Sequence, residues 1–392
     1  MINLKIHYKR VLIIVLFFIV VTSWGASFFD DIYNMTAQDV VSALKLGADP
    51  NEKDQYGDSV LIRAALYNYN PGVIQALIQG GADVNLRNKD GNTPLMVAAF
   101  NNYDTTTIFD LIKSGADVNL RNNHDLTALM LASQKTSNPD VITTLIRGGA
   151  NPNLTTKEEK TALMYAAELN FCHEIIPALV KGGADINFVS SNGGTALMVA
   201  AAFMDFNGEV AKTLIKCGAD VSIKDKNGKN ALMYAAEFNC NPDVTKAILS
   251  AGIDVNATSK SGATALMYAA SKTVTKEIVQ ILIDAGANVN IARKGGMTAL
   301  MDAAAGNNNS AIVAMLCKAK ADVDARTENG MTALMLAAQN SIEPQVITEL
   351  LNFGANPHIK TSSSLNALDF LKQNPRLRDN AELKIKLQTI GF

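Results

Sequence analysis

Histidine and cysteine are the residues of this chain best suited to acid–base or thiol chemistry, and there are four of each. An enzyme needs a nucleophile, a base or metal ligands that converge on one site. The histidines, however, are scattered along the chain at His7, His124, His173 and His358. Cys172 directly precedes His173, but consecutive residues of a loop or helix do not face each other. We therefore expect no catalytic residue and no cofactor.

Short polar residues form a second pattern that could do chemistry, because paired carboxylate and amide oxygens are typical calcium ligands. The pairs are Asp83 with Asn85, Asp117 with Asn119, and Asp185 with Asn187. In turns, such short side chains more often bond to the backbone of their own segment. The pattern therefore favours structural turns, and no metal site is predicted. No glycine-rich phosphate-binding loop precedes a helix either.

These polar turns belong to a repeat that recurs ten times at a step of 34 residues, with one step of 35 between Gly183 and Gly218. Each repeat has a segment of the type Thr-Ala-Leu-Met-x-Ala-Ala, followed by one of the type Gly-Ala-Asp-Val-Asn. A fixed period of this length predicts stacked supersecondary units. The first residues of the repeats are Ser59, Thr93, Thr127, Thr161, Thr195, Asn230, Thr264, Thr298, Thr332 and Asn366.

Each repeat encodes two short helices. Counted from its first residue, Leu at +2 and Ala at +5 and +6 share one helical face. The second helix begins at an Asn-Pro pair in several repeats, where Asn70, Asn138 and Asn241 can act as N-caps before proline. It ends at the glycine of Gly-Ala-Asp, which can adopt the left-handed conformation. Because one pair cannot bury its apolar face alone, the units must stack.

The repeat resembles the ankyrin repeat, whose pattern places Thr-Pro-Leu-His in the first helix and Gly-Ala-Asp-Val-Asn after the second. Thr93, Pro94 and Leu95 match this pattern directly. Tetratricopeptide repeats have the same period but lack the Gly-Ala-Asp turn. The resemblance implies an all-α ankyrin solenoid of about ten helix-turn-helix units with projecting turns. The histidine of the family is replaced by an apolar filler, methionine, at Met96, Met130, Met164, Met198, Met233, Met267, Met301 and Met335.

The first 26 residues have the layout of a signal peptide. Lys5, Lys9 and Arg10 precede an apolar run from Val11 to Val21, and small residues follow. We expect 1–26 to be a signal peptide or an uncleaved membrane anchor, 27–58 an N-terminal capping half-repeat, 59–365 the ankyrin repeats and 366–392 a C-terminal capping repeat. The repeats are then extracytoplasmic: periplasmic, secreted or anchored facing outward. A membrane is contacted only through the first segment, if it is uncleaved.

Composition restricts the class of partner. The formal net charge is −2, and lysine and arginine are scattered over the turns, so nucleic acid is not an expected partner. The four cysteines occupy separate repeats and are not expected to form disulfides. Charged turn tips, among them Asp90 and Arg293, are expected to be solvated. We predict a monomer that binds a partner protein.

The expected binding surface is the concave groove that the resemblance assigns to the exposed positions +4, +7 and +8 of the first helix. Repeats four to seven carry an apolar and aromatic series there, and the longer repeat adds a second aromatic in its loop. Two interpretations stay open, a partner-binding stripe or half-buried packing. A redox-protective factor and a structural spacer are the alternative functions. The candidate residues are Tyr165, Leu169, Phe203, Phe206, Tyr234, Phe238 and Tyr268.

Overall fold

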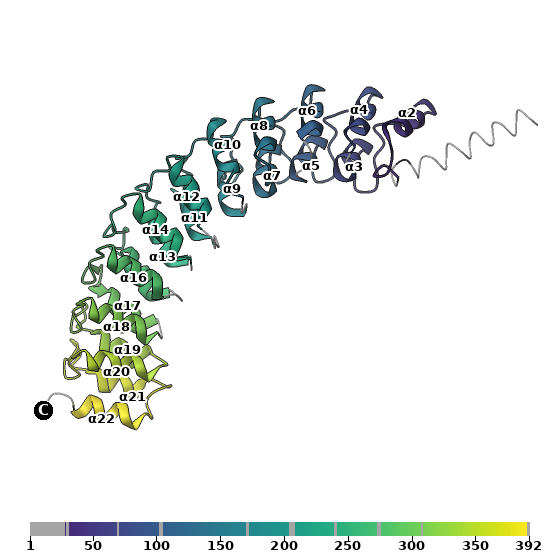
Figure 1. Ribbon diagram of the computed structural model, residues 1–392. Helices are drawn as coiled ribbons and strands as arrows, with labels where there is room; N and C mark the ends of the chain where they lie inside the picture. Colours follow the sequence, from purple (N-terminus) through teal and green to yellow (C-terminus); the bar gives the residue numbers. More distant parts are fainter. Residues whose placement is uncertain are drawn as a thin grey trace, which may run out of the picture. The chain divides into compact units, whose positions relative to one another are not determined.

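The computed structural model describes residues 28, 31–68, 70–101, 105–169, 172–203, 208–238, 241–272, 276–306 and 309–389. Over these ranges it contains 21 helices arranged in pairs, and it confirms the predicted all-α repeat fold (Figure 1). One projecting turn adds a minimal antiparallel hairpin of β1 (Ala292–Arg293) and β2 (Met297–Thr298). The proposed signal segment 1–26 lies outside the described residues. Within the described ranges, no helix combines the length and hydropathy needed to cross a bilayer.

Two rows of helices alternate along the chain. The first helices of the repeats are α3 (Val60–Tyr67), α5 (Pro94–Phe100), α7 (Ala128–Lys135), α9 (Ala162–Leu169), α11 (Ala196–Ala202), α13 (Ala231–Phe238), α15 (Ala265–Lys272), α17 (Ala299–Gly306), α19 (Ala333–Asn340) and α21 (Ala367–Gln373). The second row contains α2 (Ala37–Lys45), α4 (Pro71–Gln79), α6 (Thr105–Lys113), α8 (Pro139–Arg147), α10 (Ile175–Lys181), α12 (Glu209–Lys216), α14 (Pro242–Ser250), α16 (Lys276–Asp284), α18 (Ser310–Lys318), α20 (Pro344–Asn352) and α22 (Ala381–Thr389).

The chain divides into two compact units, residues 1–185 and 186–392. In the amino-terminal unit α3, α5, α7 and α9 pack in order, and α2, α4, α6, α8 and α10 pack in a parallel row. In the carboxyl-terminal unit the same holds for the odd-numbered helices from α11 to α21 and the even-numbered helices from α12 to α22. Each helix therefore contacts its own pair and the adjoining repeats, as expected of a solenoid.

Caps set the start of both helices. The first residue of the repeat is the N-cap of the first helix; Thr93, for example, accepts a hydrogen bond through Oγ1 from the backbone N–H of Met96 at 3.3 Å. Asn70 caps α4 by accepting from the N–H of Gly72 at 3.0 Å, with Pro71 at the first helical position. Asn138 and Asn241 cap α8 and α14 in the same way. The Asn-Pro prediction is confirmed.

The ends of the second helices need a left-handed residue. The glycine of Gly-Ala-Asp supplies it, as at Gly81 with φ of 94°. Lys320 occupies this position in one repeat and still adopts φ of 66°, a conformation that costs a side-chain-bearing residue free energy. The geometry of the turn therefore imposes the left-handed conformation on a lysine, a residue type that ordinarily disfavours it.

The core is formed by the positions that the periodicity selects. In α5, Leu95, Ala98 and Ala99 are fully buried, and the same positions are buried in the other first helices from α3 to α19; in the last one, α21, Leu368 is half-buried and Lys372 is exposed. The methionines that replace the family histidine are 1–3% exposed, so their predicted role as apolar filler is confirmed. Small alanines let neighbouring helices approach closely, and methionine adapts to the space that remains.

An asparagine chain connects consecutive turns. Asn85 donates from Nδ2 to the carbonyl of Gly115 and accepts through Oδ1 from the N–H of Asp117, at 3.0 and 2.8 Å. Asn119 repeats both bonds with Gly149 and Asn151. In these repeats one side chain thus joins a turn to the end of the next second helix, which helps to fix the spacing of the projecting turns.

Candidate binding face

The exposed side of the first helices, together with the adjoining turns, is the candidate binding face. Position +8 is the most open: Leu169, Phe203 and Phe238 are 45%, 46% and 49% exposed. Position +4 is half-buried at Tyr165 and Tyr234. The side chains at +4 are therefore half-buried, as the packing interpretation expects. The side chains at +8 are accessible to a partner, because +8 lies at the last turn of a short helix.

Phe203, Tyr234, Phe238 and Tyr268 form the aromatic patch of the carboxyl-terminal unit. They lie on α11, α13 and α15 or directly after them, and these helices pack side by side. The rings of Tyr234 and Phe238 have centroids 6.1 Å apart and are tilted by 32°. Tyr165 and Leu169 lie on α9 of the other unit, and Phe206 lies outside the described residues.

Lys229 contacts three of the four rings of the aromatic patch. Its ammonium lies 4.5 Å from the ring centroid of Tyr268, 5.7 Å from Tyr234 and 5.8 Å from Phe238. Each distance is within the range of a cation–π interaction. Nζ also pairs with Oε2 of Glu237 at 2.5 Å. The lysine comes from the turn before α13, so the turn and the helix are joined by a charged contact at the centre of the patch.

Glu237 pairs with this lysine and with a second one. Its side chain is 8% exposed and lies 3.3 Å from Nζ of Lys272, which projects from the next repeat. The Tyr234 hydroxyl donates to Oδ2 of Asp225 at 2.9 Å. Burial, followed by this hydrogen bond and the charge of Asp225, raises the pKa of Tyr234 to about 12. The charged groups of the patch thus have partners within the protein.

The turn tip at Arg293 is not simply solvated, contrary to expectation. Arg293 Nη2 contacts Oδ1 of Asp302 at 2.6 Å, and the Asp302 side chain is 9% exposed. Burial raises the pKa of Asp302, while the hydrogen bond and charge of Arg293 oppose that shift. The turn therefore folds back on its own helix and forms an ion pair, which sequence spacing did not reveal.

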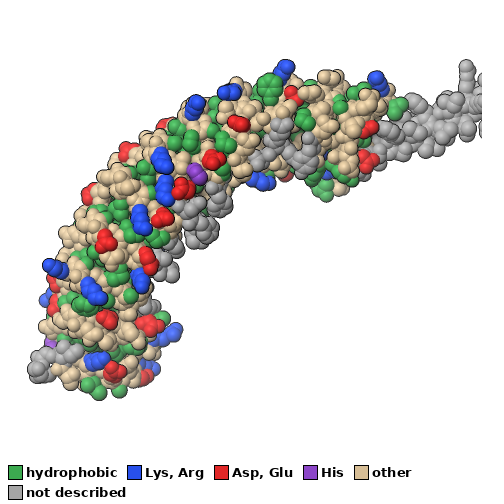
Figure 2. Space-filling view, in the orientation of Figure 1, with side chains coloured by type: hydrophobic (Ala, Val, Ile, Leu, Met, Phe, Trp, Pro, Cys, Tyr) green, Lys and Arg blue, Asp and Glu red, His purple; other side chains and the backbone are tan. Residues whose placement is uncertain are grey.

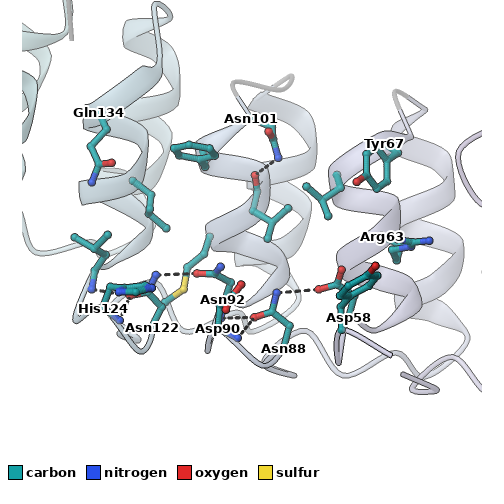
Figure 3. Close-up of a pocket in the computed structure, with 17 residues that line it drawn as sticks. Asp58, Arg63, Tyr67, Asn88, Asp90, Asn92, Asn101, Asn122, His124 and Gln134 are labelled. Carbon is teal, nitrogen blue, oxygen red and sulfur yellow. Dashed lines mark hydrogen bonds between the residues drawn. The ribbon is translucent and has the colours of Figure 1, made fainter. Parts of the chain in front are cut away.

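A groove of about 760 Å³ crosses the first helices of the amino-terminal unit at α3, α5 and α7 (Figure 3). We call it the amino-terminal groove. Leu66, Met96, Val97, Phe100 and Leu131 supply apolar lining. The other lining residues are Tyr56, Asp58, Arg63, Tyr67, Asn88, Asp90, Asn92, Asn101, Asn122, His124, Leu126 and Gln134.

Polar side chains line both long sides of the amino-terminal groove. Figure 3 shows Tyr67, Asn101 and Gln134 towards the ends of the helices, and the turn residues on the opposite side. On the turn side, Asn88 Nδ2 donates to Asp58 Oδ1 at 2.8 Å, and Asn122 Nδ2 donates to Asn92 Oδ1 at 2.8 Å. These bonds connect successive turns and fix the polar rim.

The charges of the amino-terminal groove are only partly paired. Arg63 Nη1 lies 3.6 Å from Asp54 Oδ2, and its guanidinium carbon lies 5.7 Å from the ring centroid of Tyr67. Within the described part of this unit, the ion pairs join Arg63 to Asp54, Arg121 to Asp125 and Lys160 to Glu168; none includes Asp58 or Asp90.

A family model for ankyrin repeats matches residues 32–122, 129–225, 201–293 and 274–361, and thus most of the chain. The chain belongs to the ankyrin repeat family. Ankyrin repeats are generally protein–protein interaction modules, and proteins built of them are typically non-enzymatic scaffolds. A search of curated proteins gives no match to the chain.

The ankyrin register locates the amino-terminal groove that the sequence analysis missed. Arg63, Val97 and Leu131 are +4 residues, and Tyr67 and Asn101 are +8 residues. These are the same positions that define the aromatic patch, but they are chemically mixed here, so a search for consecutive aromatics passes over them. Asp90, expected to be solvated, is exposed but borders this groove.

The remaining candidate chemistry has structural explanations. Asp83 and Asp117 accept from the N–H groups of Asn85 and Asn119 at 2.9 Å, so these turn residues bond to their own backbone as predicted. Burial raises the pKa of Cys217, and burial followed by the charge of Glu349 raises the pKa of Cys317 to about 11. Both shifts disfavour the reactive thiolate that redox chemistry requires.

Proposed function

We propose that this ankyrin repeat chain is a non-enzymatic binding protein that holds a partner protein against its first-helix face. The observation that carries the proposal is the aromatic patch, in which Phe203 and Phe238 are about half exposed beside a fixed network of charged groups. Exposed aromatic side chains provide much of the binding energy at protein interfaces. Because both lysines pair with Glu237 and Lys272 is largely exposed, a partner can cover the patch without burying an unpaired charge.

The surface charge supports a protein partner. On the face shown in Figure 2, acidic and basic side chains alternate over each unit. A nucleic-acid-binding surface would need a continuous basic stripe to neutralise phosphates. Mixed charges around a small apolar area are common at the rims of protein–protein interfaces.

The test is affinity capture with the full chain and a Phe203→Glu/Phe238→Glu variant, followed by quantitative mass spectrometry. We expect the variant to lose its specific partner at least tenfold, because two carboxylates would be buried at the contact. Phe109→Glu is the matched control, since Phe109 is 55% exposed on the second helix α6. Equal recovery of all partners by wild type and double variant would favour a structural spacer.

We also propose that the repeats act outside the cytoplasm. The basic residues, apolar run and small residues of segment 1–26 support export. Amino-terminal sequencing of the protein from its native compartment tests this: a new terminus near residue 26 is expected after cleavage, whereas an intact terminus in a membrane fraction indicates an anchor. Recovery of the intact chain from the cytosol would contradict export.

A further inference from the structure

We infer that the amino-terminal groove binds an extended peptide segment of a partner protein through a basic side chain, which is received by Asp58 and Asp90 beside Tyr56. The inference deepens the proposed function by naming a class of partner. The groove and the aromatic patch lie in different units, so an experiment can reject either proposal without rejecting the other.

The first argument is the state of Asp58. This residue is only 8% exposed, yet its carboxylate has one side-chain hydrogen bond, from Asn88, and no ion pair within the described residues. The carboxylate lines an open groove, where an incoming ammonium or guanidinium group can reach it and form the ion pair that it lacks among the described residues.

The second argument is the set of charges around Asp58. Asp90 lies on the same turn side, and the one arginine that lines the groove, Arg63, is already paired with Asp54. At the end of α7, the ammonium of Lys135 lies 4.6 Å from the ring centroid of Phe100, which lines the groove. Among the described residues that line the groove, the two carboxylates have no ion-pair partner and the one guanidinium is paired, which favours a cationic side chain on the turn side.

The third argument is the aromatic residue beside the carboxylates. Tyr56 is 61% exposed and lines the groove on the turn side, whereas Tyr67 lies on the opposite side with Arg63 over its ring. Aromatic faces attract lysine and arginine side chains, and the rings also cover the aliphatic stem of such a residue. Carboxylates and an exposed ring on one site therefore select the same partner chemistry.

The dimensions favour an extended segment. The groove crosses three first helices, which at about 8–10 Å between packed helices corresponds to roughly 20–30 Å. An extended chain rises about 3.3 Å per residue, so roughly six to nine residues span it. The apolar floor at Val97 and Leu131 can accept alternate side chains while the others face the polar rim.

The experiment is selection of random heptapeptides displayed on phage against the full chain. We expect lysine and arginine to be enriched at least threefold in the selected peptides. The best peptide is then synthesised, and its affinity is measured by fluorescence anisotropy. Absence of any binding peptide, or enrichment of acidic or wholly apolar sequences, would overturn the inference.

The matched variant is Asp58→Asn/Asp90→Asn, which removes two charges and keeps side-chain shape; the amide oxygen of residue 58 can still accept from Asn88. We expect about tenfold weaker binding of the selected peptide. Asp140→Asn/Glu174→Gln removes the same charge at the starts of α8 and α10 and should change affinity less than twofold. Thermal unfolding of each variant checks that the fold is retained.

A second substitution, in the peptide, identifies the contact. Replacing its basic residue with citrulline should weaken binding to wild type about tenfold and binding to Asp58→Asn/Asp90→Asn less than twofold. Independent losses in the two backgrounds would contradict a direct contact. Phe203→Glu/Phe238→Glu should leave the affinity for this peptide unchanged. If the groove does not bind peptides, the proposal for the aromatic patch still stands, and the reverse is also true.

Discussion

The amino-terminal groove and the aromatic patch use the same positions of the ankyrin repeat but treat charge in opposite ways. In the patch, the residue just before the first helix is Lys229, and it is neutralised by Glu237. In the groove, the same position is Asp58, and no described cation pairs with it. The same turn position thus carries a charge that is paired within the protein at Lys229 and has no described cation partner at Asp58.

The largest expected effect concerns the neutralised charges of the patch. In Glu237→Gln, the ammonium of Lys229 stays among the aromatic rings but loses its counter-ion. We therefore expect the free energy of unfolding to fall by about 2 kcal/mol. Urea denaturation of the full chain measures this. Glu168→Gln is the matched control in the other unit, because Lys160 is the one described residue that forms an ion pair with Glu168; its loss should be smaller, about 1 kcal/mol. Equal losses would mean that bridging two lysines adds no stability.

Salt should weaken binding at the groove more than binding at the aromatic patch. Raising sodium chloride from about 50 to 500 mM should weaken peptide binding to the groove about fivefold, since screening acts on the attraction between unpaired acids and the incoming cation. Binding at the aromatic patch should change less than twofold, because its charges are already paired. Parallel anisotropy titrations give both values. If the affinity of the peptide for the groove did not change with salt, unpaired acidic groups would not be the basis of binding there.

The smallest effect is confined to alkaline pH. The folded-state pKa of Tyr234 is about 12, above the ordinary value of 10.0. The protonated phenol is therefore favoured by folding, and its contribution to stability is complete below pH 10 and is lost as pH rises from 10 towards 12. Tyrosinate absorbance should show one late-titrating group that Tyr234→Phe removes.

Asp225→Asn provides the control for this titration. It removes the charge that faces the Tyr234 hydroxyl and should move the late step towards pH 10. A late step that persists unchanged in Asp225→Asn would mean that burial alone sets the pKa of Tyr234.

The fold could be predicted almost entirely from sequence. The 34-residue period, the Asn-Pro caps at Asn70, Asn138 and Asn241, and the apolar face of the first helices all depend on local geometry. The exposure of Phe203 and Phe238 followed from the same geometry. The role of these two side chains in binding remains a prediction.

The contacts between turns and helices could not be predicted from the period. Lys229 reaches Tyr268 in the next repeat, and Arg293 reaches Asp302 nine residues away. Both contacts depend on how a projecting turn bends towards its helix, which varies with each turn's own residues. The groove was missed for a related reason: Asp58 and Arg63 carry no distinctive spacing, and their significance is electrostatic and appears only when neighbouring repeats are placed side by side.

The asparagine chain between turns has a consequence for how such a molecule can change in length. Asn85 and Asn119 each recognise only backbone groups of the following repeat, a glycine carbonyl and one N–H. Both groups are present whatever side chains that repeat carries. A duplicated or deleted copy would therefore find the same attachment points, so the number of modules can drift during evolution without redesign of the neighbours, while each copy's outward residues diversify freely.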